Sequence, residues 1–151
     1  MIVFTFLIGC VAGLRTMTAP AAIAWSAWLG WTVLGGTWAG FMASVWAVAL
    51  FSLAALAEFV TDQLPATPSR KVPMQFGARI VSGAVCGAML GTAAGATVPG
   101  LLVGAAGAVA GTLGGAWARG RAAAAFGQDR PAALLEDAVA IVLGLVAAAA
   151  L

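Results

Sequence analysis

Glycine recurs on a four-residue rhythm between residues 77 and 115, and this spacing constrains the fold more than any other feature of the chain. Residues four apart share one face of an α-helix. In water each glycine costs a helix about 1 kcal/mol relative to alanine, but in lipid a glycine stripe lets two helix backbones approach closely. We therefore expect closely packed membrane helices. The glycines expected at their contacts are Gly83, Gly87, Gly91, Gly95, Gly104, Gly107 and Gly111.

The composition places the chain among membrane proteins. Of its 151 residues, 63% are hydrophobic and 8% are charged, whereas soluble domains are roughly half apolar and about a quarter charged. A span needs about 20 residues, so residues 1–151 suit one integral membrane domain with about four to six short spans. The predicted fold class is an all-α polytopic transmembrane bundle. The apolar runs cover residues 1–14, 16–34, 38–61, 77–96, 99–118 and 131–151.

The first 34 residues allow two interpretations, because they are too long for one straight span and short for two. Arg15 and Pro20 interrupt this segment. Either a tight hairpin of two short helices or one broken helix fits, and we favour the hairpin.

Two charged segments are expected to be loops. Residues 62–76 contain prolines and a basic pair, and residues 119–130 contain three arginines, with Asp129 as a candidate N-cap and Pro131 at the first helical position. Because Lys- and Arg-bearing loops tend to stay in the cytoplasm, both loops are predicted to be cytoplasmic. The opposite, uncharged turn gathers tryptophans, which we interpret as interfacial anchors.

A short pattern occurs twice. Residues 13–18 and 77–82 share a glycine, an arginine and a hydroxyl residue at matched positions. If each copy opens a helix, the chain holds a parallel two-fold repeat over residues 13–62 and 77–121. The flanking helices would then be residues 1–12 and 131–151.

Six charged residues lie within or beside the apolar runs, where each costs about 3 kcal/mol on insertion scales and therefore marks a candidate functional position. Glu58 and Asp62 are four residues apart and share one helix face. The predicted topology brings all six to the cytoplasmic third of the bundle. The candidate ion- or substrate-binding residues are Arg15, Glu58, Asp62, Arg79, Glu136 and Asp137.

The residue types exclude several kinds of site. The chain has no histidine, and its two cysteines stand alone in apolar stretches, so the usual zinc, haem and iron–sulfur ligand sets are missing and no cofactor is expected. Seven basic residues are too few and too scattered for a nucleic-acid partner. The expected partners are the lipid bilayer, a small ion or solute, and a second copy of the chain, since a glycine stripe serves a dimer contact as well as internal packing.

Several of these residues together resemble a known family. Gly13-Leu14-Arg15 with Pro20, the string Ala57-Glu58-Phe59-Val60-Thr61-Asp62-Gln63-Leu64-Pro65, Pro68-Ser69-Arg70, and Arg79 with Gly83 are similar to the bacterial membrane proteins of domain-of-unknown-function family 4126. The most specific element is Glu-x-x-x-Asp-x-x-Pro leaving a membrane helix. The resemblance implies a bacterial inner-membrane protein and supports Arg15, Glu58, Asp62 and Arg79 as positions of interest, but it implies no activity.

Three functions remain open at this point. The first is a small transporter or channel-like protein whose carboxylates bind a cation or relay protons, while the arginines hold them or accept an anion. The second is a structural or assembly protein whose buried charges fix helix packing. The third is an enzyme acting on lipid head groups, although no metal-binding spacing supports it.

Overall fold

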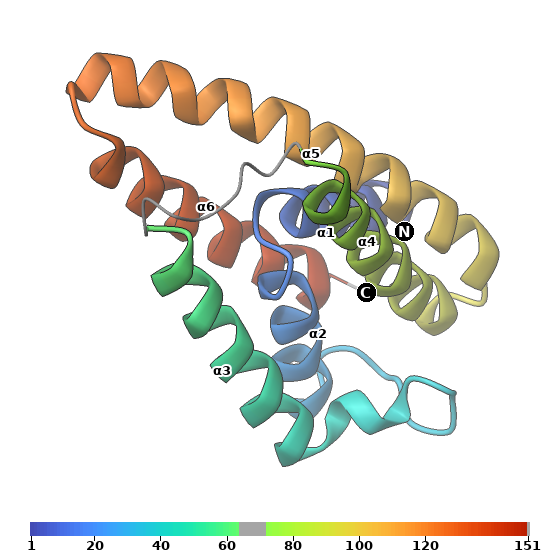
Figure 1. The fold of residues 1–151 in the computed structure, drawn as a ribbon. Coiled ribbons are helices and arrows are strands. Elements are labelled where there is room, and N and C mark those ends of the chain that lie inside the picture. The colour runs from blue at the N-terminus through green and yellow to red at the C-terminus, as the bar shows by residue number, and fades with distance from the viewer. Residues whose placement is uncertain (64–71, 151) are drawn as a thin grey trace.

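The structure is a computed structural model that describes residues 1–63 and 72–150, and these residues form an all-helical bundle (Figure 1). The predicted all-α fold is confirmed. A short 3-10 helix, η1 (Gly40–Ala43), precedes α3. The α-helices are α1 (Ile2–Leu14), α2 (Thr18–Trp28), α3 (Val45–Thr61), α4 (Pro73–Ala93), α5 (Thr97–Phe126) and α6 (Asp129–Ala149).

Three described helices, α4, α5 and α6, are long and apolar enough to cross a membrane. The apolar helices α1 and α3 are shorter, at 13 and 17 residues, which gives lengths of about 20 and 25 Å at 1.5 Å per residue. The hydrocarbon layer is about 30 Å thick. The protein is therefore a membrane protein with three full-length candidate spans among its described residues.

The first 34 residues contain two separate helices, α1 and α2. These helices contact each other only slightly, so they do not form the tight hairpin that we favoured. Arg15 ends α1 in an extended conformation with φ −141° and ψ 112°. The helices then join different parts of the bundle. Helix α1 packs mainly against α4 and α5, α2 packs against α3, and α6 contacts both groups (Figure 1).

Glycines bring α5 against α4 and α1 with almost no space between the backbones. A Cβ atom added at Gly87 or Gly104 would lie under 3.0 Å from backbone atoms of the facing helix, as would one at Gly107 or Gly111 against α1. The stripe is therefore used within the chain. Gly95 is an exception to the expectation, because it lies in the turn between α4 and α5 with φ +71° and nothing within 4 Å of an added Cβ. The left-handed backbone of that turn favours glycine.

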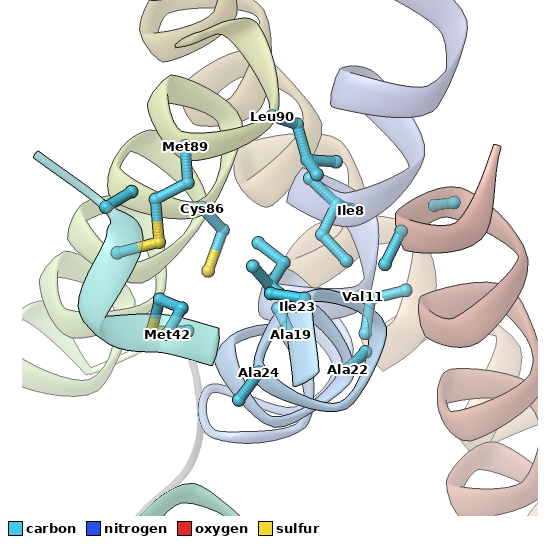
Figure 2. Packing of buried hydrophobic residues seen from close by; sticks show 14 of the residues in the cluster. Ile8, Val11, Ala19, Ala22, Ile23, Ala24, Met42, Cys86, Met89 and Leu90 are labelled. Carbon is cyan, nitrogen blue, oxygen red and sulfur yellow. The ribbon is translucent and has the colours of Figure 1, made fainter. Parts of the chain in front are cut away.

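The interior contains many small residues and a few large apolar ones, whereas most large apolar residues point outwards. Figure 2 shows Ile8, Ile23, Cys86 and Leu90 among the buried side chains where α1, α2 and α4 meet. By contrast, Trp46 on α3 is 80% exposed. The remaining large exposed side chains of α3 include Leu50, Leu53, Leu56 and Val60. This distribution suits a bundle whose outer surface contacts lipid.

Both predicted loops are shorter than expected. Pro73 already begins α4, as a proline at the first helical position; residues 64–71 lie outside the described residues. The segment 119–130 is mostly helix, because α5 continues to Phe126 through four alanines, which are strong helix formers. Gly127, with φ +66°, ends α5. Helix α6 then begins at Asp129, so the prediction of Pro131 at its first position was wrong.

The two copies of the short pattern adopt different local structures. Gly13 lies in the last turn of α1 and Arg15 follows that helix, whereas Gly77 and Arg79 both lie inside α4. The expectation that each copy opens a helix was therefore wrong, because contacts from other helices break the backbone at Arg15, as described below. The two-fold repeat stays a prediction.

Candidate functional site

Arg15 is the centre of a charged cluster that joins three parts of the fold. Its side chain is fully buried although it lies in a short connection between α1 and α2. One guanidinium nitrogen, Nη1, donates a hydrogen bond to Oδ2 of Asp62, which follows α3. The other, Nη2, lies 2.6 Å from Oδ1 of Asp137 in α6. The guanidinium carbon is also 5.5 Å from the ring centroid of Phe59, within the range of a cation–π contact.

Glu58 satisfies the backbone where α2 begins. Its Oε1 accepts a hydrogen bond from the Thr16 backbone N–H at 2.7 Å, and its Oε2 accepts one from the Met17 N–H at 2.8 Å. The N–H groups at the start of a helix lack partners within the helix, and the helix dipole favours a negative charge there. Glu58 in α3 therefore acts as a cap for α2 supplied by another helix.

Arg79 donates hydrogen bonds to the backbone carbonyl groups at the end of α1. Its Nη1 donates to the backbone oxygens of Gly13 at 2.9 Å and Leu14 at 2.6 Å. Its Nη2 lies 3.8 Å from Oε1 of Glu58 and 3.9 Å from Oδ2 of Asp62. With Glu58, it holds the break between α1 and α2 from both sides, which is why the chain can leave helical geometry at Arg15.

A second group of charges lies towards the surface, between α5 and α6. Arg119 makes a two-pronged pair with Asp129, with Nη2 to Oδ2 at 2.6 Å and Nε to Oδ1 at 3.0 Å. Its Nη1 also lies 3.5 Å from Oε2 of Glu136. Asp129 does not cap α6 with its side chain, because that carboxylate bonds Arg119 instead. Beside this group is a cavity of about 120 Å³ whose polar lining residues are Arg119 and Glu136.

Charges of both signs lie close together in this part of the described structure, where three arginines contact four carboxylates that are buried or half-buried. Charges removed from water are stable when they are paired and hydrogen-bonded. The residues counted are Arg15, Arg79, Arg119, Glu58, Asp62, Glu136 and Asp137.

The structure brings the six sequence-predicted residues to one end of the bundle. Arg15, Glu58, Asp62, Arg79 and Asp137 form one connected network, while Glu136 faces the outer group. Sequence reasoning missed Arg119 because it placed that residue in a loop. The alanine run that follows Arg119 was the signal that the helix continues past it.

No group of three or more His, Cys, Asp or Glu residues within the described ranges has the arrangement needed to hold a metal ion. The fold and the charged cluster together define an all-helical membrane protein with a buried arginine–carboxylate network near one end. No protein-family model, no curated protein and no solved structure matches the chain.

Proposed function

We propose that the protein is a small bacterial inner-membrane transporter or channel-like protein, in which Asp62, Arg15 and Asp137 bind a small ion or relay protons. The observation that carries the proposal is that carboxylates from two different helices share one buried guanidinium. Two carboxylates this close together favour the uptake of a proton or a cation, although Arg79 also lies 3.9 Å from Asp62.

The geometry at Asp137 supports exchange rather than a permanent pair. Its Oδ1 lies 2.6 Å from Nη2 of Arg15, yet neither atom has a hydrogen-bond partner with acceptable geometry among the described residues. The side chains of Asp62 and Asp137 are 16% and 10% exposed, whereas that of Arg15 is 0% exposed. Each carboxylate therefore keeps a small exposed edge, although Oδ1 of Asp137 is itself buried.

The orientation belongs to the proposal. Arg119, Arg121 and Arg130 lie near the junction of α5 and α6, the same end as the charged cluster. Basic residues are retained in the cytoplasm, so we place this end on the cytoplasmic side. Association with a second copy, and membership of domain-of-unknown-function family 4126, are retained as part of the same proposal; no cofactor or catalytic step is assigned.

The alternative is a structural or assembly protein, and one observation favours it. Glu58 and Arg79 form hydrogen bonds with the backbone between α1 and α2. Such contacts fix helix packing and need no ligand. The two functions therefore differ in what Asp62 and Asp137 do, and the experiment must act on those residues.

The test is ion and proton flux into proteoliposomes that contain the wild type, Asp62→Asn or Asp137→Asn. Both substitutions keep the side-chain size and remove one negative charge. Asp129→Asn is the matched control, because Asp129 is 62% exposed and pairs with Arg119 outside the Arg15 group. We expect flux from the wild type and the control and none from the two variants, with all four proteins monodisperse in size-exclusion chromatography. Absence of wild-type flux across a panel of monovalent ions and protons would overturn the transport proposal in favour of the structural one.

A further inference from the structure

An apolar groove of about 400 Å³ lies between α2, α3 and α6, on the other side of Phe59 from the charged cluster. Its volume is in the range of ligand pockets, about 300–1,000 Å³. Small residues form its floor, so the space exists because these helices do not fill it with large side chains. The floor residues are Ala21, Ala22 and Ala55.

The groove presents almost no polar group to an occupant. The Thr18 hydroxyl oxygen is fully buried and therefore does not face the open space. The Ser52 hydroxyl already accepts a hydrogen bond from Nε1 of Trp25 at 3.0 Å. An occupant must consequently be apolar along its length, because a polar group placed here would lose its hydration without gaining partners.

The groove opens sideways, through the surface that carries the large apolar side chains. Its rim includes Trp25, Leu56 and Ile141, which are 40%, 56% and 41% exposed. In a membrane protein such a surface contacts lipid, so the substance at the opening is the hydrocarbon chain of a phospholipid. Unfilled apolar space costs dispersion contacts, which a flexible chain restores.

The two ends of the groove carry different residues, and this difference determines the orientation of an elongated occupant. Phe59 closes the end beside Arg15, whereas Trp25, Leu29 and Trp31 stand at the other end. Helix α2, which forms one wall, has 11 residues and is about 16 Å long at 1.5 Å per residue. Tryptophan side chains are enriched at the level of lipid head groups.

We propose that this groove binds one acyl chain of a membrane phospholipid, with the chain's methyl end against Phe59 and its head group near Trp31. The inference rests on the membrane location and is independent of ion transport. Because Phe59 lies between the groove and Arg15, the bound chain also supports the wall that separates lipid from the charged cluster.

The test uses tryptophan fluorescence in vesicles that contain phosphatidylcholine brominated on one acyl chain, since bromine quenches a nearby indole. A variant that keeps Trp25 and replaces the other five tryptophans by phenylalanine reports on the groove. Filling substitutions come from two walls, Ala21→Leu and Ala55→Leu. The matched control is Ala57→Leu, on the exposed side of α3.

We expect brominated lipid to quench Trp25, and bromines near the ester end to quench it more than bromines near the methyl end. Because Trp25 is 40% exposed and also contacts lipid outside the groove, its quenching should fall in part in Ala21→Leu and in Ala55→Leu, but stay unchanged in Ala57→Leu. A parallel protein that keeps only Trp46, outside the groove and 80% exposed, should be quenched equally with and without the filling substitutions. Trp25 quenching that is unchanged by both filling substitutions in monodisperse protein would overturn the proposal, because the lipid would then touch Trp25 from outside only.

Discussion

At the scale of single residues, Glu58 and Asp62 show how two carboxylates one helical turn apart acquire different roles. Glu58 lies in the last turn of α3, and Asp62 directly follows the helix. Glu58 accepts hydrogen bonds from two backbone N–H groups, whereas Asp62 pairs with the Arg15 side chain. A backbone partner cannot move without moving the helix, but a side-chain partner can. Asp62 is therefore the better exchange group and Glu58 the better structural one.

The first prediction compares Glu58→Gln with Asp62→Asn. Glutamine offers one acceptor oxygen where Glu58 offers two, so one buried N–H group of the α1–α2 connection loses its partner, at a cost of about 1–3 kcal/mol in the free energy of unfolding. Asp62→Asn should cost less, since Arg15 retains Asp137. Denaturant unfolding in detergent, followed by circular dichroism, measures both. Equal losses would show that the two carboxylates play the same part.

The second prediction concerns Arg15. Replacing it with methionine leaves Asp62 and Asp137 without their shared cation, and breaking a buried pair costs about 3–5 kcal/mol. Adding Asp62→Asn and Asp137→Asn to Arg15→Met should restore part of that stability, because the unpaired charges are removed together. The unfolding free energies of the single and triple variants test whether stability is restored. A triple variant that is less stable than Arg15→Met would mean that the two carboxylates stabilise the protein without Arg15.

At the scale of helices, glycine decides which surfaces meet. Helix α5 carries Gly100 and Gly104 against α4, and Gly107 and Gly111 against α1. The pattern of glycines predicted close packing, but it could not say which helix each glycine faces. The end of α5 was missed for a different reason: three arginines suggested a loop, whereas the four alanines that follow Arg121 continue the helix. Local charge was outweighed by helix propensity.

The third prediction follows from this contact. Gly104→Ala places a methyl group against the backbone of α4, and overpacking of this kind costs about 1–3 kcal/mol. Gly114→Ala is the control on the same helix, because an added Cβ there meets nothing within 4 Å. It should be neutral or slightly stabilising, by up to about 1 kcal/mol of helix propensity. Thermal unfolding of both variants gives the comparison, and a stable Gly104→Ala would show that α4 and α5 can separate without loss.

At the scale of the whole molecule, the charged side chains of the described residues gather at one end and most tryptophans at the other, with Trp117 beside Arg121 as the exception. The Trp38 indole donates to Thr92 in the last turn of α4, while Arg79 lies near the start of the same helix. The sequence was enough to predict this polarity, the all-α class and the convergence of the six charged residues. Which charged residues pair with one another could not be predicted from the sequence, because the pairing depends on the break in the helix at Arg15. Glu58 of α3 and Arg79 of α4 bond the backbone groups at that break, and these partners come from distant parts of the sequence.

The fourth prediction tests which way this polarity faces. In a cysteine-free background, Cys10→Ala with Cys86→Ala, single cysteines are introduced by Val33→Cys and Gln128→Cys. Val33 is 73% exposed in the connection after α2, and Gln128 is exposed between α5 and α6. If basic residues hold the charged end in the cytoplasm, a membrane-impermeant thiol reagent should label Val33→Cys in intact bacterial cells and label Gln128→Cys only after permeabilisation. The reverse labelling pattern would mean that the protein has the opposite orientation in the membrane. Asp62 and Asp137 would then bind their ion from outside the cell, and the proposed direction of access would be reversed.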